Sequence, residues 1–162
     1  MRVFLGFIFF LGTICGSAGQ DLSGHWQGYL TQAAGAPQTR YGFEMVLQQR
    51  KDKIEGTSTI TWEQNFGTMR LSGTFEGKTF HFQETALLKN KILANFTWCI
   101  KKGTLALSED EYYFYLQGPW EGYTHYSTCQ PGYIWLRRKK TLLARTSGAV
   151  LPNRPLCFSI EE

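Results

Sequence analysis

Apolar and small side chains occupy every second position along much of this chain. In the segment 22–32 this set consists of Leu22, Gly24, Trp26, Gly28 and Leu30. The positions between them hold three polar side chains and a tyrosine. Alternation with a period of two predicts a strand that buries one face. The same alternation returns in the segments 41–48, 54–62, 69–75, 80–82, 93–107, 112–116 and 132–137.

Short polar stretches separate the predicted strands. Arg50–Lys53 and Glu76–Lys78 have the composition of tight turns, and we expect another turn at Lys89–Lys91. Strands joined by tight turns pair with their neighbours in sequence. Closing such a sheet buries its aromatic face and removes its free edges. We therefore predict an all-β fold, a single up-and-down antiparallel β-barrel of about eight strands, with a long loop at Gly118–Gly132.

The two ends of the chain differ from this pattern. A single arginine precedes a short apolar run, and Ser17 and Gly19 suit a signal-peptidase site, so we predict a signal peptide over 1–19. An uncleaved anchor and a lipidated Cys15 are the alternatives. The barrel domain would span 20–140, with a proline-containing C-terminal tail over 141–162. This organisation predicts a secreted or periplasmic protein whose mature chain has no membrane span.

Cysteine usage follows from the predicted compartment. Secretion into an oxidising environment favours a disulfide. Cys15 leaves with the signal peptide, and three thiols remain. We predict a bond between Cys99 and Cys129, with Cys157 free or intermolecular. The alternative is that Cys157 pairs with one of these two cysteines and leaves the other buried.

Charge and motif content narrow the class of function. The formal net charge is +4, and loss of the signal peptide removes Arg2 and no acidic residue. This mild charge argues against a nucleic-acid partner, and the basic run Arg137–Lys140 is interpreted as a solvated rim. The three histidines lack zinc-ligand spacing, and the carboxylates do not converge across a cleft. We therefore expect no metal, no cofactor and no enzymatic activity.

Glu84 is the one carboxylate whose position is informative. It shares the parity of Phe80 and Phe82, so a continuing strand would point it into the barrel. A buried carboxylate would need a partner, and it would offer a ligand an acceptor. We expect instead that the strand ends at Phe82 and leaves Glu84 at the rim in water.

A family resemblance rests on the first predicted strand. Gly24-His25-Trp26 resembles the Gly-x-Trp signature of the lipocalin-like, or calycin, barrels. The resemblance implies that Trp26 closes one end of the barrel, with a basic residue of the last strand, Arg137 or Arg138, packed over it. Gly-Thr pairs in the strands are similar to those of the avidin relatives. The phrase Leu22–Trp26 also resembles the opening of bacterial inhibitors of secreted metalloproteases, which are small barrels with one disulfide.

Two functions are compatible with these features. The calycin resemblance implies a cup for a small hydrophobic or amphipathic ligand, and we predict Ser58, Trp62, Glu84 and Trp98 as its lining residues. The alternative is an interaction module, such as a protease inhibitor or an envelope-associated protein, that uses the 118–132 loop. An interior filled by aromatic side chains would favour the module, and an apolar pocket would favour the cup.

Overall fold

Eight strands make up almost all of the described chain. The computed structural model describes residues 20–32, 39–92 and 97–141. The predicted signal peptide, most of the predicted tail and Cys157 lie outside the described residues. The strands are β1 (Gly24–Gln32), β2 (Arg40–Arg50), β3 (Lys53–Trp62), β4 (Asn65–Glu76), β5 (Thr79–Lys91), β6 (Ile100–Glu109), β7 (Tyr113–Tyr123) and β8 (Gly132–Lys139).

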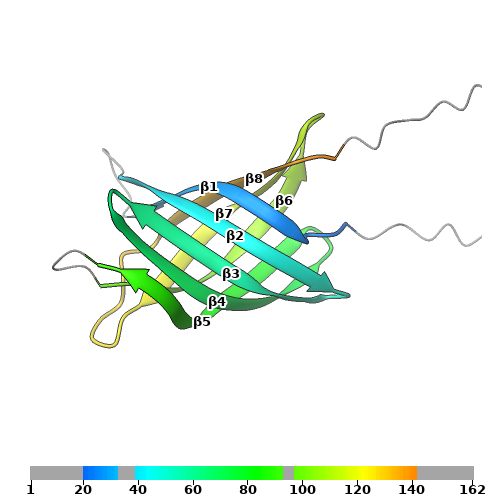
Figure 1. Cartoon of the computed structure of the whole chain (residues 1–162). Helices are drawn as coiled ribbons and strands as arrows, with labels where there is room; N and C mark the ends of the chain where they lie inside the picture. The colour runs from blue at the N-terminus through cyan, green and yellow to red at the C-terminus, as the bar shows by residue number, and fades with distance from the viewer. Residues whose placement is uncertain (1–19, 33–38, 93–96, 142–162) are drawn as a thin grey trace, which may run out of the picture.

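The strands form one closed antiparallel barrel (Figure 1). Each strand pairs with the next one in sequence, and β8 returns to pair with β1. This arrangement confirms the predicted all-β, up-and-down, eight-stranded fold. The part of the chain that the structure describes has no helix long and apolar enough to cross a membrane.

Inward side chains fill the middle of the barrel. Phe43 and Met45 of β2 and Phe80 and Phe82 of β5 are buried there, as the alternation predicts. The other buried apolar members of this core are Leu22, Trp26, Leu30, Leu47, Ile54, Leu71, Phe75, Leu105, Leu107, Leu116, Trp120, Ile134 and Leu136. A ligand therefore cannot occupy the centre of the barrel without displacing packed side chains.

The predicted turn at Lys89–Lys91 is wrong. β5 continues to Lys91, and its backbone pairs there with Phe66–Thr68 of β4. The side chains of this part of β5 are exposed. An exposed strand segment buries neither face, so its sequence does not have to alternate apolar and polar residues. Its polar composition therefore cannot be distinguished from that of a turn.

The boundaries of β6 and β7 also differ from the prediction. β6 begins at Ile100, so Cys99 and Trp98 precede the strand. β7 extends through Pro119 to Tyr123, so the predicted loop shrinks to residues 124–131. Proline has no N–H to donate, and the β6–β7 ladder omits Gly118 and Pro119, whereas β8 still pairs with both. A proline that would interrupt a central ladder is tolerated at this gap.

Trp26 closes one end of the barrel. Its indole N–H donates to the Leu22 carbonyl at 2.8 Å, and the Arg138 guanidinium carbon lies 4.7 Å from the ring centroid. Arg138 also donates to the carbonyls of Asp21 and Ser23, and its partial burial lowers its pKa. We call Leu22, Trp26 and Arg138 the closed end.

The basic residue over Trp26 is Arg138 and not Arg137. Ile134 and Leu136 of β8 point inward, and strand alternation places Arg138 on the same face. Arg137 lies on the outer face, where its guanidinium carbon is 5.0 Å from the ring centroid of Tyr113. The parity of β8 was sufficient to choose between the two arginines.

Candidate ligand site at the open end of the barrel

A small cavity lies at the end of the barrel opposite the closed end. Its volume is about 90 Å³, roughly three times the volume that one water molecule occupies in the liquid. Strands β1, β2, β3, β4, β6 and β7 and the segment 97–99 contribute to its wall. The aromatic and aliphatic side chains that line it are Leu30, Tyr41, Ile60, Trp62, Trp98 and Trp120, and the polar ones are Gln32, Asn65, Thr97 and Lys101. We call this region the open end.

The four predicted lining residues divide into two pairs. Trp62 and Trp98 line the cavity, whereas Ser58 and Glu84 do not. Trp62 and Tyr41 form one aromatic wall, with ring centroids 6.0 Å apart and planes inclined by 54°. Ser58 and Glu84 lie in the barrel interior and bind to each other. The structure therefore brings together the two tryptophans at the cavity and the two polar residues below it.

The Trp98 indole has room at its position because Gly67 of β4 has no side chain. A Cβ atom added at Gly67 of β4 would lie 2.9 Å and 3.0 Å from the two ring-fusion carbons of the Trp98 indole. Any side chain at Gly67 would push the indole away. The Trp98 indole N–H is buried and has no hydrogen-bond partner among the described residues. Such an unpaired donor is costly in a folded protein, by about 1–3 kcal/mol.

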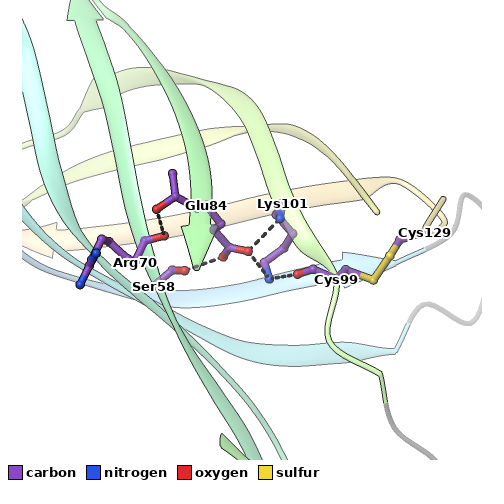
Figure 2. A network of polar contacts seen from close by, with 7 residues as sticks. Ser58, Arg70, Glu84, Cys99, Lys101 and Cys129 are labelled. Atoms are coloured by element: carbon purple, nitrogen blue, oxygen red, sulfur yellow. Dashed lines mark hydrogen bonds and ion pairs between the residues drawn. A yellow bond between two sulfur atoms is a disulfide. The ribbon is translucent and has the colours of Figure 1, made fainter. Parts of the chain in front are cut away.

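Glu84 is fully buried, so its predicted position at the rim in water is wrong. Figure 2 shows the Glu84 carboxylate between Ser58 and Lys101. Its carboxylate accepts from the Ser58 hydroxyl at 2.5 Å and from the Lys101 backbone N–H at 2.8 Å. The Lys101 ammonium lies 3.0 Å from the same carboxylate. The β5–β6 ladder ends at the pair Gln83–Lys102. The Glu84 carboxylate therefore accepts the hydrogen bond of the Lys101 backbone N–H at the point where β5 and β6 separate.

Lys101 connects this pair to the cavity. Its ammonium also donates to the Cys99 carbonyl at 3.0 Å and lies 5.6 Å from the centroid of Phe43. Its side chain is almost fully buried and lines the cavity. Desolvating two charges is expensive, and several hydrogen bonds are needed to offset that cost. The site consequently presents a buried pair with no net charge beneath the two tryptophans.

Lys101 was missed at the sequence level, although a signal existed. Leu105 and Leu107 are inward positions of β6, and Lys101 and Gly103 share their parity. A lysine on an inward face requires an acidic partner, and Glu84 on an inward face requires a basic one. Considering both residues together would have predicted the pair.

The predicted disulfide between Cys99 and Cys129 is present, with the two Cα atoms 6.3 Å apart. It ties the segment before β6 to the loop 124–131. The Cys129 N–H also donates to the Gly122 carbonyl at 2.8 Å. Because Cys99 follows Trp98 directly and its carbonyl binds Lys101, the disulfide fixes two parts of the cavity wall.

The histidines lie away from the cavity. His25 is exposed and contacts Glu44 at 2.8 Å, and His81 is exposed with its ring nitrogen 3.0 Å from the Thr104 hydroxyl. Within the described ranges, no three side chains of the metal-binding types come together as a candidate metal site.

The sequence matches no protein-family model, and no curated protein matches it significantly. Function therefore has to be inferred from the barrel and from its open end.

Proposed function

We propose that this chain is a lipocalin-like binding protein that holds a small, mainly apolar molecule at the open end of its barrel. The observation that carries this proposal is the cavity between Trp62 and Trp98, above the buried Lys101. Binding sites of this kind combine apolar walls with a few polar groups that orient the ligand. The mouth of a small barrel is a common place for one.

The difference between the two ends supports this location. At the closed end, the Trp26 indole N–H is bonded to the Leu22 carbonyl and the Arg138 guanidinium lies over the indole ring. A more open hollow of about 400 Å³ beside Arg138 is lined by charged and polar side chains, among them His25, Arg137 and Lys139. The filled interior limits the ligand to a few non-hydrogen atoms below the rim. The proposal is thus a shallow site at the mouth, and not a deep cup.

Two features support the family and the compartment. A closed up-and-down barrel with an arginine stacked on a first-strand tryptophan agrees with the calycin resemblance. A disulfide between Cys99 and Cys129 is compatible with an oxidising, extracytoplasmic location. We propose that the segment 1–19 directs the protein there.

Native mass spectrometry of the protein recovered from its own host tests the binding function. We expect an adduct of low mass that disappears on denaturation. A Trp62→Ala variant should lose the adduct, and Trp135→Ala, a matched change on the outer face, should keep it. A bare chain mass in every native spectrum would contradict the proposal.

A second candidate function is favoured by Tyr126, whose side chain is 94 % exposed. It lies in the loop 124–131, which the disulfide holds. Exposed tyrosines on a rigid loop are typical anchors for protein partners. Recovery of a stoichiometric protein partner that a Tyr126→Ser variant no longer retains would favour this interaction module over the small-molecule site.

A further inference from the structure

The outer surface of the barrel carries a row of aromatic and basic side chains on the neighbouring strands β7, β8, β1 and β2 (Figure 1). We call this row the aromatic–basic face, and its members are Tyr29, Arg40, Tyr113, Tyr115, Trp135 and Arg137. We propose that it binds a polysaccharide chain that carries carboxylate or sulfate groups. This site is separate from the open end, because none of its residues lines that cavity.

The aromatic rings of this face contact one another across the strands. The Tyr29 and Trp135 rings are stacked, with centroids 5.6 Å apart and planes inclined by 21°. The Tyr115 ring lies 5.6 Å from Trp135 and 6.3 Å from Tyr113, measured between centroids. All four side chains are half-buried. The rings therefore form a continuous surface across β1, β8 and β7, held in place by cross-strand contacts.

Two arginines are held against these rings. The guanidinium carbon of Arg40 lies 4.6 Å from the centroid of Tyr29. That of Arg137 lies 5.0 Å from the centroid of Tyr113 and 6.0 Å from that of Trp135. Cation–π contacts restrict an arginine without using its N–H groups. Neither guanidinium forms an ion pair or hydrogen bond with another described residue. Each can therefore donate two parallel hydrogen bonds to a carboxylate or sulfate.

The hollow of about 400 Å³ beside Arg138 lies at one end of this face. Its lining residues are His25, Gln27, Tyr113, Arg137, Arg138 and Lys139. No acidic residue of the described chain lines it, whereas the two larger surface hollows include Glu121 and Glu55, respectively. Arg138 donates to two backbone carbonyls, and Lys139 has no ion-pair partner among the described residues. The hollow therefore attracts anions and can hold one beside Arg137.

The carboxylates near this surface are engaged elsewhere. Glu44 contacts His25 at 2.8 Å, Asp110 accepts hydrogen bonds from the start of β7, and Asp21 accepts one from a backbone N–H. None of the three forms an ion pair with the basic residues of the aromatic–basic face. Those basic residues therefore keep charge that an anionic partner can neutralise.

An acidic sugar chain suits this surface better than other polyanions. Sugar rings have apolar C–H faces that pack on aromatic side chains, and their hydroxyl groups suit an amide such as Gln27 in the hollow. A membrane surface is bound by apolar side chains that insert into it, and the face contains no aliphatic side chain. A nucleic acid is bound mainly through its many phosphates, and the mild net charge of +4 argues against it.

Three polysaccharides of similar chain length test the proposal. Dextran sulfate carries sulfates, polygalacturonate carries carboxylates, and dextran carries no charge. By isothermal titration calorimetry of the full-length protein, we expect at least one charged chain to bind and neutral dextran not to bind. Binding should weaken as the salt concentration rises from about 50 to about 200 mM. The tighter of the two charged chains identifies the preferred oxyanion.

Substitutions separate a built site from general charge attraction. Arg137→Gln should weaken binding of the tighter chain roughly tenfold. Arg70→Gln removes the same charge from another exposed position and should change the affinity less than about twofold. Trp135→Ala removes no charge but takes away a ring that positions Arg137, and it should weaken binding roughly threefold. Tyr123→Ala, an exposed aromatic residue outside the face, is its matched control. The unfolding midpoint of each variant checks that it is folded.

Several results would overturn the proposal. Equal losses in Arg137→Gln and Arg70→Gln would mean that only the overall charge attracts the chain. Binding of neutral dextran as tight as that of the charged chains would contradict the role of the arginines. Tighter binding of polyglutamate or of a single-stranded oligonucleotide, weakened by the same substitutions, would assign the face to another class of partner. Absence of binding by both charged chains would also overturn it, and would leave the proposed function of the open end unaffected.

Discussion

The two ends of this barrel each contain a large indole, and the two indoles have different surroundings. Trp26 is fully buried, donates to the Leu22 carbonyl and carries the Arg138 guanidinium on its face. Trp98 is partly buried, borders a cavity and has an indole N–H with no partner among the described residues. A satisfied indole stabilises the fold, whereas a buried indole N–H without a partner reduces the stability of the folded state. We propose that stability depends mainly on the closed end of the barrel and binding of the small ligand on the open end.

The largest expected effect comes from removing the closed-end indole. Trp26→Ala should destabilise the protein by about 4–5 kcal/mol, because it deletes a fully buried side chain and the surface on which Arg138 packs. Trp98→Ala should cost less than about 1 kcal/mol, because it also removes an unpaired donor. Urea unfolding of the two variants measures this difference. Similar losses of unfolding free energy in Trp26→Ala and Trp98→Ala would contradict the distinction between the closed end and the open end.

Breaking the buried pair below the cavity should have the next largest effect. Lys101→Met leaves the Glu84 carboxylate without its cation and should cost about 3 kcal/mol. The double variant Lys101→Met/Glu84→Leu replaces the pair by apolar side chains and should recover most of that loss. Unfolding curves of the single and double variants form the required comparison. A double variant as unstable as the single one would show that the pair has another structural role.

A smaller and more local effect is expected at Gly67. In Gly67→Ala the added methyl group would meet the Trp98 ring at about 3 Å, so the indole must move. We expect a loss of about 1–2 kcal/mol from overpacking and a change in the shape of the cavity. Binding of a small cyclic probe of the cavity, such as cyclopentanone, should fall, whereas the indole NMR signal of Trp26 should stay where it is. Unchanged binding would mean that the position of Trp98 does not define the site.

Acid should destabilise the turn between β6 and β7 through Asp110, which precedes β7. Its carboxylate accepts from the Tyr115 hydroxyl at 2.5 Å and from the N–H groups of Tyr113 and Tyr112, and these bonds lower its pKa below 3.8. The folded state therefore binds this proton less readily than the unfolded chain does. The stabilisation is present above about pH 4 and is lost as the pH falls through the lowered pKa.

The variant Asp110→Asn isolates this contribution. Its unfolding free energy should be lower than that of the parent at neutral pH, and the two should converge in acid. The same hydrogen bond raises the pKa of Tyr115. An Asp110→Asn variant whose stability runs parallel to that of the parent between pH 5 and pH 2 would contradict the assignment.

The fold was largely predictable because its first half follows a simple rule. In β2, β3 and the start of β4 the inward and outward residues alternate, and the turns between them are short and polar. The second half departs from that rule for identifiable reasons. The end of β5 is exposed and reads as a turn, and the ladder gap at Pro119 hides the continuation of β7.

The site was less predictable because it depends on contacts between distant parts of the chain. Trp98 does not lie on a strand, and its position requires Gly67 beneath the ring and the disulfide at Cys99. The depth of Glu84 depends on where β5 and β6 separate, which no local pattern reveals. Residue type and parity identified Trp62, Trp98 and Glu84 as candidates. They did not show that the tryptophans border a cavity from which Glu84 is absent.

The most direct test of binding at the open end uses cyclopentanone as a small cyclic probe and follows the indole signals of the full-length protein by two-dimensional NMR. We expect the probe to shift the signals of Trp98 and Trp62 at the open end, and to leave unchanged those of Trp26 at the closed end and Trp135 on the outer face. Shifts confined to Trp26 or Trp135, or no shift of any indole at saturating ketone, would contradict the assignment of binding to the open end.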